Sequence, residues 1–260
     1  DFPLYDDEAF RYSGLPVFAH EILKPTLLRL QHSRPRDIKS SLNIHGMIIK
    51  QYHAGIVIFT PPRDGKKYFI GVDVSEGLAF GDSSAIFIMD ESYFQVCRYH
   101  GKIPPDLLGH LTMALGELYN NALAVVENNN MGHTTITTLK AESYPNIYKK
   151  VIEDKKTKEI SVKLGWNTHR QSKFDMLNEG IKILRDGRAR INDIDLIEEM
   201  QTVSYAENGL PELNGKDRTV AYCLACIGRK HYDGSIRVRP GQLSRETHDL
   251  GPRIMKDDFF

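Results

Sequence analysis

Apolar and polar residues follow a short-range pattern in much of the first half of the chain that is typical of β-strands. Runs rich in β-branched and aromatic residues are brief and are interrupted by glycine, proline and aspartate. The expected strands are residues 55–60, 67–73, 84–89, 93–99 and 122–127. A charged hairpin is expected at residues 147–165, where two β-rich runs flank a polar turn.

A second pattern, with apolar residues every three or four positions, predicts helices. It begins after Pro104 and Pro105, where leucines recur through residue 118, and a proline pair suits a helix start. The other expected helices are residues 134–142, 172–185 and 217–230. Strands, helix, strand and further helices form an α/β plan, so we expect a mixed sheet with antiparallel first strands and helices on both faces.

The composition supports one large domain of 260 residues with 41% hydrophobic residues, enough for a real core. Residues 1–50 have the scattered turn residues of a connecting region, 51–232 the pattern of the folded domain, and 233–260 that of an extension. No apolar run approaches the ~18 residues that a membrane span requires. The chain begins without Met or a signal-peptide pattern, and we expect a piece of a longer protein.

Three cysteines are too few for a disulfide framework. Cys223 and Cys226 form a C-x-x-C pair, which occurs in zinc and redox sites. No second pair accompanies them, and they lie in an apolar helical stretch. We therefore interpret both as small core residues.

Charge is balanced overall, with 34 basic and 34 acidic residues, but it is unevenly distributed. Residues 149–190 contain 12 basic and 6 acidic residues, whereas residues 191–220 contain 2 basic and 7 acidic ones. A basic surface beside an acidic pocket suits an enzyme that holds a polyanion against metal ions. Ordinary solvated helix faces explain the same pattern, and the lysines of the expected hairpin are open to either interpretation.

Three acidic residues stand at the ends of apolar elements. Asp73 and Glu127 each end an expected strand, and Asp217 precedes the last expected helix. Such carboxylates are costly to bring together unless a cation neutralises them, and Mg²⁺ and Mn²⁺ prefer oxygen ligands. A helix N-cap explains Asp217 nearly as well, and Asp73 could instead hold a turn through its own backbone. Asp82 is a fourth candidate ligand or another turn former.

These residues lie in motifs whose order is informative. The motifs are YFIGVD at 68–73 with Gly77, GDSSA at 81–85, VVENN at 125–129, LGWNT at 164–168, and GKDR at 215–218 before AYCLA at 221–225. In this order they resemble the C-terminal nuclease domain of the large terminase subunits of tailed bacteriophages. The segment from Phe2 to Phe18 resembles the end of the packaging ATPase domain and its linker.

The resemblance implies an RNase H-like fold and an endonuclease that cuts concatemeric double-stranded viral DNA during genome packaging. It implies a two-metal hydrolytic mechanism with Mg²⁺ or Mn²⁺, leaving 3′-hydroxyl and 5′-phosphate ends. Asp73, Glu127 and Asp217 take the positions of the three catalytic, metal-binding acids, with Asp73 bridging the metals and Asp82 a further candidate ligand. The implied partners are DNA, the portal protein and the small terminase subunit. The implied setting is a motor ring, at the procapsid in the host cytoplasm, built from a chain that is monomeric alone.

Two features depart from the full family pattern. The family often has two adjacent acids at the last motif, and Lys216 replaces the first, which favours weak occupancy of the second metal position until DNA phosphates join it. None of the three Gly-Lys pairs has P-loop spacing, so the packaging ATPase is absent from this chain. Two alternatives stay open: another RNase H-like enzyme such as a Holliday-junction resolvase or recombinase, or a non-catalytic module that docks the motor to portal and DNA.

Overall fold

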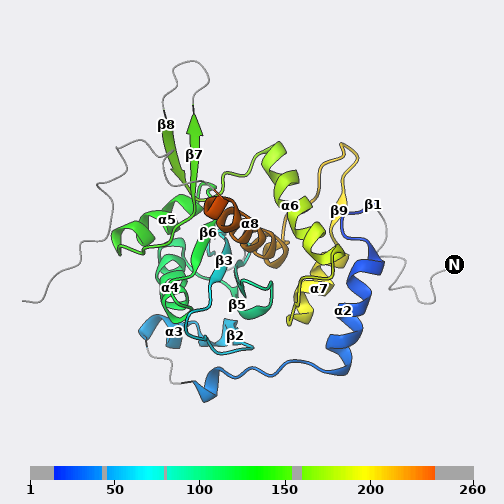
Figure 1. Cartoon of the computed structure of the whole chain (residues 1–260), viewed down its shortest axis with the longest axis horizontal. Coiled ribbons are helices and arrows are strands. Elements are labelled where there is room, and N and C mark those ends of the chain that lie inside the picture. Colours follow the sequence, from blue (N-terminus) through cyan, green and yellow to red (C-terminus); the bar gives the residue numbers. More distant parts are fainter. Residues whose placement is uncertain (1–14, 43–45, 79–80, 154–159, 238–260) are drawn as a thin grey trace, which may run out of the picture.

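The structure, a computed structural model, describes residues 15–42, 46–78, 81–153 and 160–237. Its longer elements are arranged around one central sheet (Figure 1). In chain order the helices and strands are β1 (Leu15–Pro16), α2 (His20–His32), α3 (Met47–Gln51), β2 (Ile56–Ile58), β3 (Tyr68–Asp73), β4 (Ser84–Asp90), β5 (Gln95–Gly101), α4 (Pro105–Leu118), β6 (Leu123–Val126), α5 (Gly132–Ala141), β7 (Lys149–Glu153), β8 (Ile160–Leu164), α6 (Arg170–Arg185), α7 (Ile194–Gln201), β9 (Ser204–Tyr205) and α8 (Asp217–Arg237).

The central sheet has five strands in the order β2-β5-β4-β3-β6. Every neighbouring pair is antiparallel except β3 and β6, which run parallel. The predicted mixed sheet with antiparallel first strands is therefore confirmed, and each of its five strands falls at a predicted position. The hairpin β7–β8 is also present and projects away from the sheet (Figure 1).

Helices cover both faces of the sheet, as predicted. On β3, Tyr68, Ile70 and Val72 belong to a buried cluster that includes residues of α4 and α5. Phe69 belongs to the opposite cluster, which is formed with α2, α6, α7 and α8. Side chains that alternate along a strand point to opposite faces, so one buried strand serves two cores.

The last helix crosses directly over β3, and a glycine permits this close approach. A Cβ atom on Gly71 would lie 1.8 Å from the carbonyl oxygen of Ala221 and 2.6 Å from the backbone nitrogen of Ala225. Any side chain at Gly71 would push α8 off the sheet. Because α8 begins at Asp217, this contact also fixes where that carboxylate lies relative to the strand ends.

Helices α2 and α7 are not predicted by the sequence pattern. In α2, Leu23 and Leu30 are fully buried, and the helix packs against α7. Its apolar face is narrow and Pro25 lies inside it, so it resembles a connecting segment. The predicted division of the chain near residue 50 stays a prediction.

Three predicted segments fall wholly or partly outside the described residues. They are most of the segment from Phe2 to Phe18, the hairpin turn at 154–159, and the tail from 238. The last helix is longer than predicted, since it continues to Arg237 instead of ending near residue 230. Within the described ranges, no helix is both long and apolar enough to cross a membrane.

The C-x-x-C pair lies in the core, as predicted. Cys223 and Cys226 are unpaired thiols on α8 and are fully buried. Burial raises the pKa of the Cys226 thiol to about 12 and the pKa of Cys223 well above its ordinary value. Both sulfurs are therefore protonated and inert at neutral pH.

Candidate metal centre

Two of the predicted acids meet where neighbouring strands end. Val72 of β3 is paired with Val126 of β6, and the Glu127 backbone N–H donates to the Val72 carbonyl at 2.9 Å. Parallel strands that end together leave their following side chains at one edge of the sheet. Asp73 and Glu127 accordingly lie side by side, and their carboxyl groups share a hydrogen bond. The Asn129 side-chain amide donates to Glu127 Oε2 at 3.3 Å and helps to orient it.

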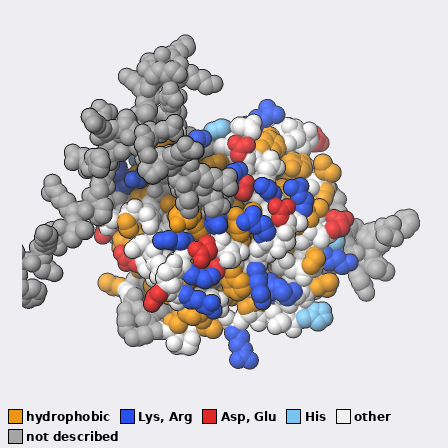
Figure 2. Space-filling view, in the orientation of Figure 1, with side chains coloured by type: hydrophobic (Ala, Val, Ile, Leu, Met, Phe, Trp, Pro, Cys, Tyr) orange, Lys and Arg blue, Asp and Glu red, His pale blue; other side chains and the backbone are white. Residues whose placement is uncertain are grey.

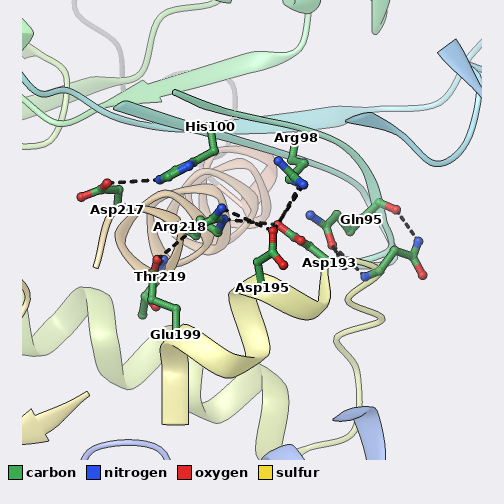
Figure 3. A network of polar contacts seen from close by, with 10 residues as sticks. Gln95, Arg98, His100, Asp193, Asp195, Glu199, Asp217, Arg218 and Thr219 are labelled. Carbon is green, nitrogen blue, oxygen red and sulfur yellow. Dashed lines mark hydrogen bonds and ion pairs between the residues drawn. The ribbon is translucent and has the colours of Figure 1, made fainter. Parts of the chain in front are cut away.

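The third acid approaches from the helix above. Asp217 is the first residue of α8, is 8% exposed, and lies 3.3 Å from Nε2 of His100 on β5 (Figure 3). The backbone N–H and hydroxyl of Thr219 both donate to Glu199 Oε1 at 2.7 Å. Glu199 on α7 thus accepts a hydrogen bond from a free backbone N–H group in the first turn of α8. This arrangement weakens the explanation of Asp217 as a helix cap.

The three carboxylates influence one another electrostatically. Burial raises the pKa of Asp73 well above its usual range, and the nearby charge and hydrogen bond of Glu127 raise it further. The charges of Asp217 and Glu199 act in the same direction. Asp73 therefore retains a proton at pH values where a solvated aspartate is ionised, unless another cation replaces that proton.

All four predicted ligand positions line one cavity of 230 Å³. Asp73, Glu127, Asp217 and Asp82 contribute to its wall. Asp82 is exposed, and it also lines a larger adjoining cleft of 1210 Å³. The sequence prediction that these residues belong to one site is therefore matched by their positions, while their roles as ligands stay a prediction.

The donor set suits a hard divalent cation, but its present geometry is not that of a closed metal cage. Within the described ranges, no group of three or more His, Cys, Asp or Glu side chains is arranged to hold a metal ion. The raised pKa of Asp73 favours its protonated form, whose carboxyl group is hydrogen-bonded to Glu127, and the Asp217 carboxylate lies beside His100. A cation could take the place of that proton, and oxygen-rich sites of this kind keep waters or phosphates as the remaining ligands.

A second group of charges, which the sequence pattern does not predict, lies beside the first. Arg98 Nε is 3.1 Å from Asp193 Oδ2, and Arg98 and Arg218 each place a terminal nitrogen 3.4 Å from Asp195 Oδ2 (Figure 3). Arg218 Nη1 is 3.6 Å from Glu199 Oε2. Burial raises the pKa of Asp193, although both arginines lower it. The excess of acids at residues 191–220 is the sequence signal for this group.

Lys216 does not take part in the cavity. Its ammonium donates to the hydroxyl of Thr202 at 2.6 Å. The side chain of Lys216, at the position where an acid is often found in the resembling family, therefore points to the segment between α7 and β9. Asp217 is the acid that this motif contributes.

On the face drawn in Figure 2, the described side chains form no single patch of one charge. Basic side chains are scattered there among acidic ones and apolar ones (Figure 2). The predicted basic surface is therefore not evident as a block in this view.

Comparison with known proteins gives a structural likeness and no sequence match. No protein-family model and no curated protein matches the chain. The chain is similar to the crystal structure of the large terminase nuclease from thermophilic phage G20c with bound magnesium, with a TM-score of 0.53 and 15% identity, covering 66% of this chain and 87% of that one. The cobalt-bound structure of the same protein gives the same values. A further structure of the G20c nuclease gives a TM-score of 0.50 and 16% identity over the same shares of the two chains.

These likenesses show the fold. The chain has the RNase H-like mixed sheet with flanking helices that its motifs predict, and the resemblance to large-terminase nuclease domains is confirmed at that level. The magnesium and cobalt belong to those neighbours.

Proposed function

We propose that this chain is a metal-dependent endonuclease that cuts double-stranded DNA, acting as the nuclease of a viral genome-packaging motor. One observation carries the proposal: Asp73, Glu127 and Asp217 line one cavity at the end of an RNase H-like sheet, where burial and the neighbouring Glu127 raise the pKa of Asp73. Strongly perturbed pKa values cluster at functional sites, and Asp73, unlike Asp193, has no arginine among its described partners. The neighbours with bound magnesium and cobalt support the choice of a divalent cation.

Asp73, Glu127 and Asp217 would hold the cation, with Asp82 at the exposed rim as a further candidate. When bound, Mg²⁺ or Mn²⁺, in the two-metal form, supplies charge stabilisation and an activated nucleophile for phosphodiester hydrolysis. Asn129 orients Glu127, and His100 lies beside Asp217 and orients its carboxylate. The adjoining cleft of 1210 Å³ gives the substrate access to this cavity.

The setting of the enzyme is part of the same proposal. Concatemeric viral DNA is its substrate, the portal protein and small terminase subunit are its partners, and the procapsid in the host cytoplasm is its location. The family resemblance supports these points, and the fold is compatible with them. The non-catalytic docking module and the junction-specific resolvase are the outcomes that the following test separates from it.

The test is cleavage of supercoiled plasmid with Mg²⁺, with Mn²⁺ and with EDTA. We expect nicking and linearisation with either metal and none with EDTA. Asp73→Asn removes a charged ligand while keeping its shape, and we expect a loss of roughly 10³-fold or more. Asp64→Asn, in the exposed turn before β3, is the matched control and should cut like the wild type.

Equal cutting by the Asp73 variant and the wild type would overturn the site. No cutting by the wild type with either metal would favour the docking module. Selective cutting of four-way junctions over linear duplex would favour a resolvase.

A further inference from the structure

The wall of the cavity beside Glu127 is formed by the segment that leads into α6. The Trp166 N–H donates to the Val126 carbonyl at 2.8 Å, and the Asn128 N–H donates to the Trp166 carbonyl at 2.7 Å. This short parallel pairing extends the sheet beyond β6. It places Thr168, two residues later, past the strand end that carries Glu127. Thr168 lines both the acidic cavity and the adjoining cleft.

The hydroxyl of Thr168 lacks a partner in this part of the protein. Its Oγ1 atom is buried, and it makes no hydrogen bond to any group in the described ranges. Buried hydroxyl groups are nearly always hydrogen-bonded, because an unmet one loses its hydration without compensation. A hydroxyl of this kind at the boundary of two cavities is available to donate to a ligand with acceptor oxygens.

A lysine on the same wall is also unpaired. Lys173, in the first turn of α6, is the one cation among the described residues that line the 230 Å³ cavity, together with four carboxylates. It is half-buried, yet it forms no ion pair within 4.0 Å among the described side chains. A lysine that remains separate from nearby acids keeps its ammonium group free for an anionic ligand.

The start of α6 holds both residues in place. The backbone N–H of His169 donates to Ser172 Oγ at 2.8 Å, and the imidazole of His169 accepts from the Ser172 N–H at 3.4 Å. The Ser172 hydroxyl also donates to the Asn167 carbonyl at 2.8 Å. This capping box makes the turn between Thr168 and Lys173 rigid. The two donors are thus presented before any ligand binds.

We propose that Thr168 and Lys173 bind a phosphate of the DNA backbone and hold the strand against the acidic cavity. A phosphodiester offers only acceptor oxygens and one negative charge, which matches one hydroxyl donor and one ammonium donor. The four carboxylates of the cavity repel a phosphate group. Donors on the cavity wall, one cationic and one neutral, are needed to offset this repulsion. The proposal rests on the nuclease function and adds to it a subsite that requires no metal.

The test measures the affinity of the full chain for a labelled DNA duplex by fluorescence anisotropy in EDTA, over a series of salt concentrations. Lys173→Met keeps the length of the side chain without its charge. We expect about tenfold weaker binding and a slope of log K against log salt that is shallower by about one. Lys182→Met is the matched control, because Lys182 lies on the same helix and lines a separate cavity of 580 Å³.

Thr168→Val removes the hydroxyl at constant shape, and Thr168→Ser retains it. We expect the valine variant to bind about threefold more weakly with an unchanged salt slope, and the serine variant to bind like the wild type. With Mg²⁺, both Lys173→Met and Thr168→Val should raise the KM for duplex more than they lower kcat. Melting temperatures near that of the wild type show that the variants are folded.

Unchanged binding in both variants, or an equal loss in Lys182→Met, overturns the subsite. Thr168→Ser matching Thr168→Val overturns the role of the hydroxyl even if the valine variant is destabilised. The nuclease function is judged separately by Asp73→Asn, which should abolish cutting while leaving DNA binding in EDTA intact. A chain that cuts DNA but binds it independently of Thr168 and Lys173 retains the function and loses the subsite.

Discussion

Two groups of acids lie on the same face of the sheet, and the protein pairs only one of them with arginines. Asp193, Asp195 and Glu199 are bound by Arg98 and Arg218 in a continuous network of ion pairs. In the group in the cavity, by contrast, a hydrogen bond joins Asp73 and Glu127, and one histidine lies beside Asp217.

The difference between the arginine-paired acids and the acids of the cavity points to different roles for the two groups. Arginines do lie next to buried acids in this protein. One of them, Arg218, directly follows Asp217 in the chain, yet it pairs with the acids of the other group. The described neighbours of Asp73 include no such arginine, so under the proposed function a cation from solution would supply the positive charge. We therefore infer that the first group is structural, and the proposed function assigns the second to a ligand.

The largest expected effect on stability comes from breaking the neutralised group. Arg98→Met leaves Asp193, whose side chain is only 5% exposed, without its closest cation. We expect the free energy of unfolding to fall by about 3 kcal/mol, because a buried charge loses its partner. Urea denaturation in EDTA measures this, with Arg63→Met in an exposed turn as the control. A loss as small as that of the control would mean that the network is not structural.

In the cavity, we expect a substitution to raise the free energy of unfolding instead of lowering it. Asp73→Asn removes a buried carboxylate that its neighbours repel, and we expect the metal-free protein to gain about 1 kcal/mol of stability. The same urea titration measures the change. Destabilisation by this substitution would show that Asp73 is already compensated inside the protein, and the contrast between the two groups would disappear.

The pH dependence of folding stability gives a finer test of the same comparison. The pKa of Asp73 is raised in the folded state, so the folded protein binds more protons than the unfolded chain between the unfolded and folded pKa values. The contribution of Asp73 is thus fully present below the ordinary aspartate pKa and is lost as pH rises through the folded pKa. In EDTA, Asp73→Asn should remove this part of the decline in melting temperature, whereas Asp64→Asn should leave it unchanged. Identical pH profiles for wild type and Asp73→Asn would contradict the shift.

Much of the fold could be predicted from the chain because its strands are short, apolar and clearly bounded. The acids at strand ends were also predictable, since Asp73 and Glu127 directly follow nearly uninterrupted apolar runs. Helices α2 and α7 were not, because α2 contains a proline and α7 has only eight residues. Their apolar faces become evident only when they pack against the rest of the core.

The neighbours of the site were harder to predict. His100 and Glu199 reach it from β5 and α7, far from the acids in sequence, and neither follows an apolar run. Thr168 belongs to a quoted motif, but its significance depends on a buried hydroxyl without a partner, which only the folded chain reveals. Pairing across the sheet and packing of helices bring such residues together, and no local pattern records them.

Binding of Mn²⁺ to the intact chain tests the central claim most directly. We predict that saturating Mn²⁺ raises the melting temperature of the wild type by roughly 5 °C, since a ligand that binds only the folded state stabilises it. Asp73→Asn should lose most of that rise, and Asp64→Asn should retain it. A wild-type melting temperature that does not respond to Mn²⁺, or an equal rise in Asp73→Asn, would contradict a metal centre at Asp73, Glu127 and Asp217.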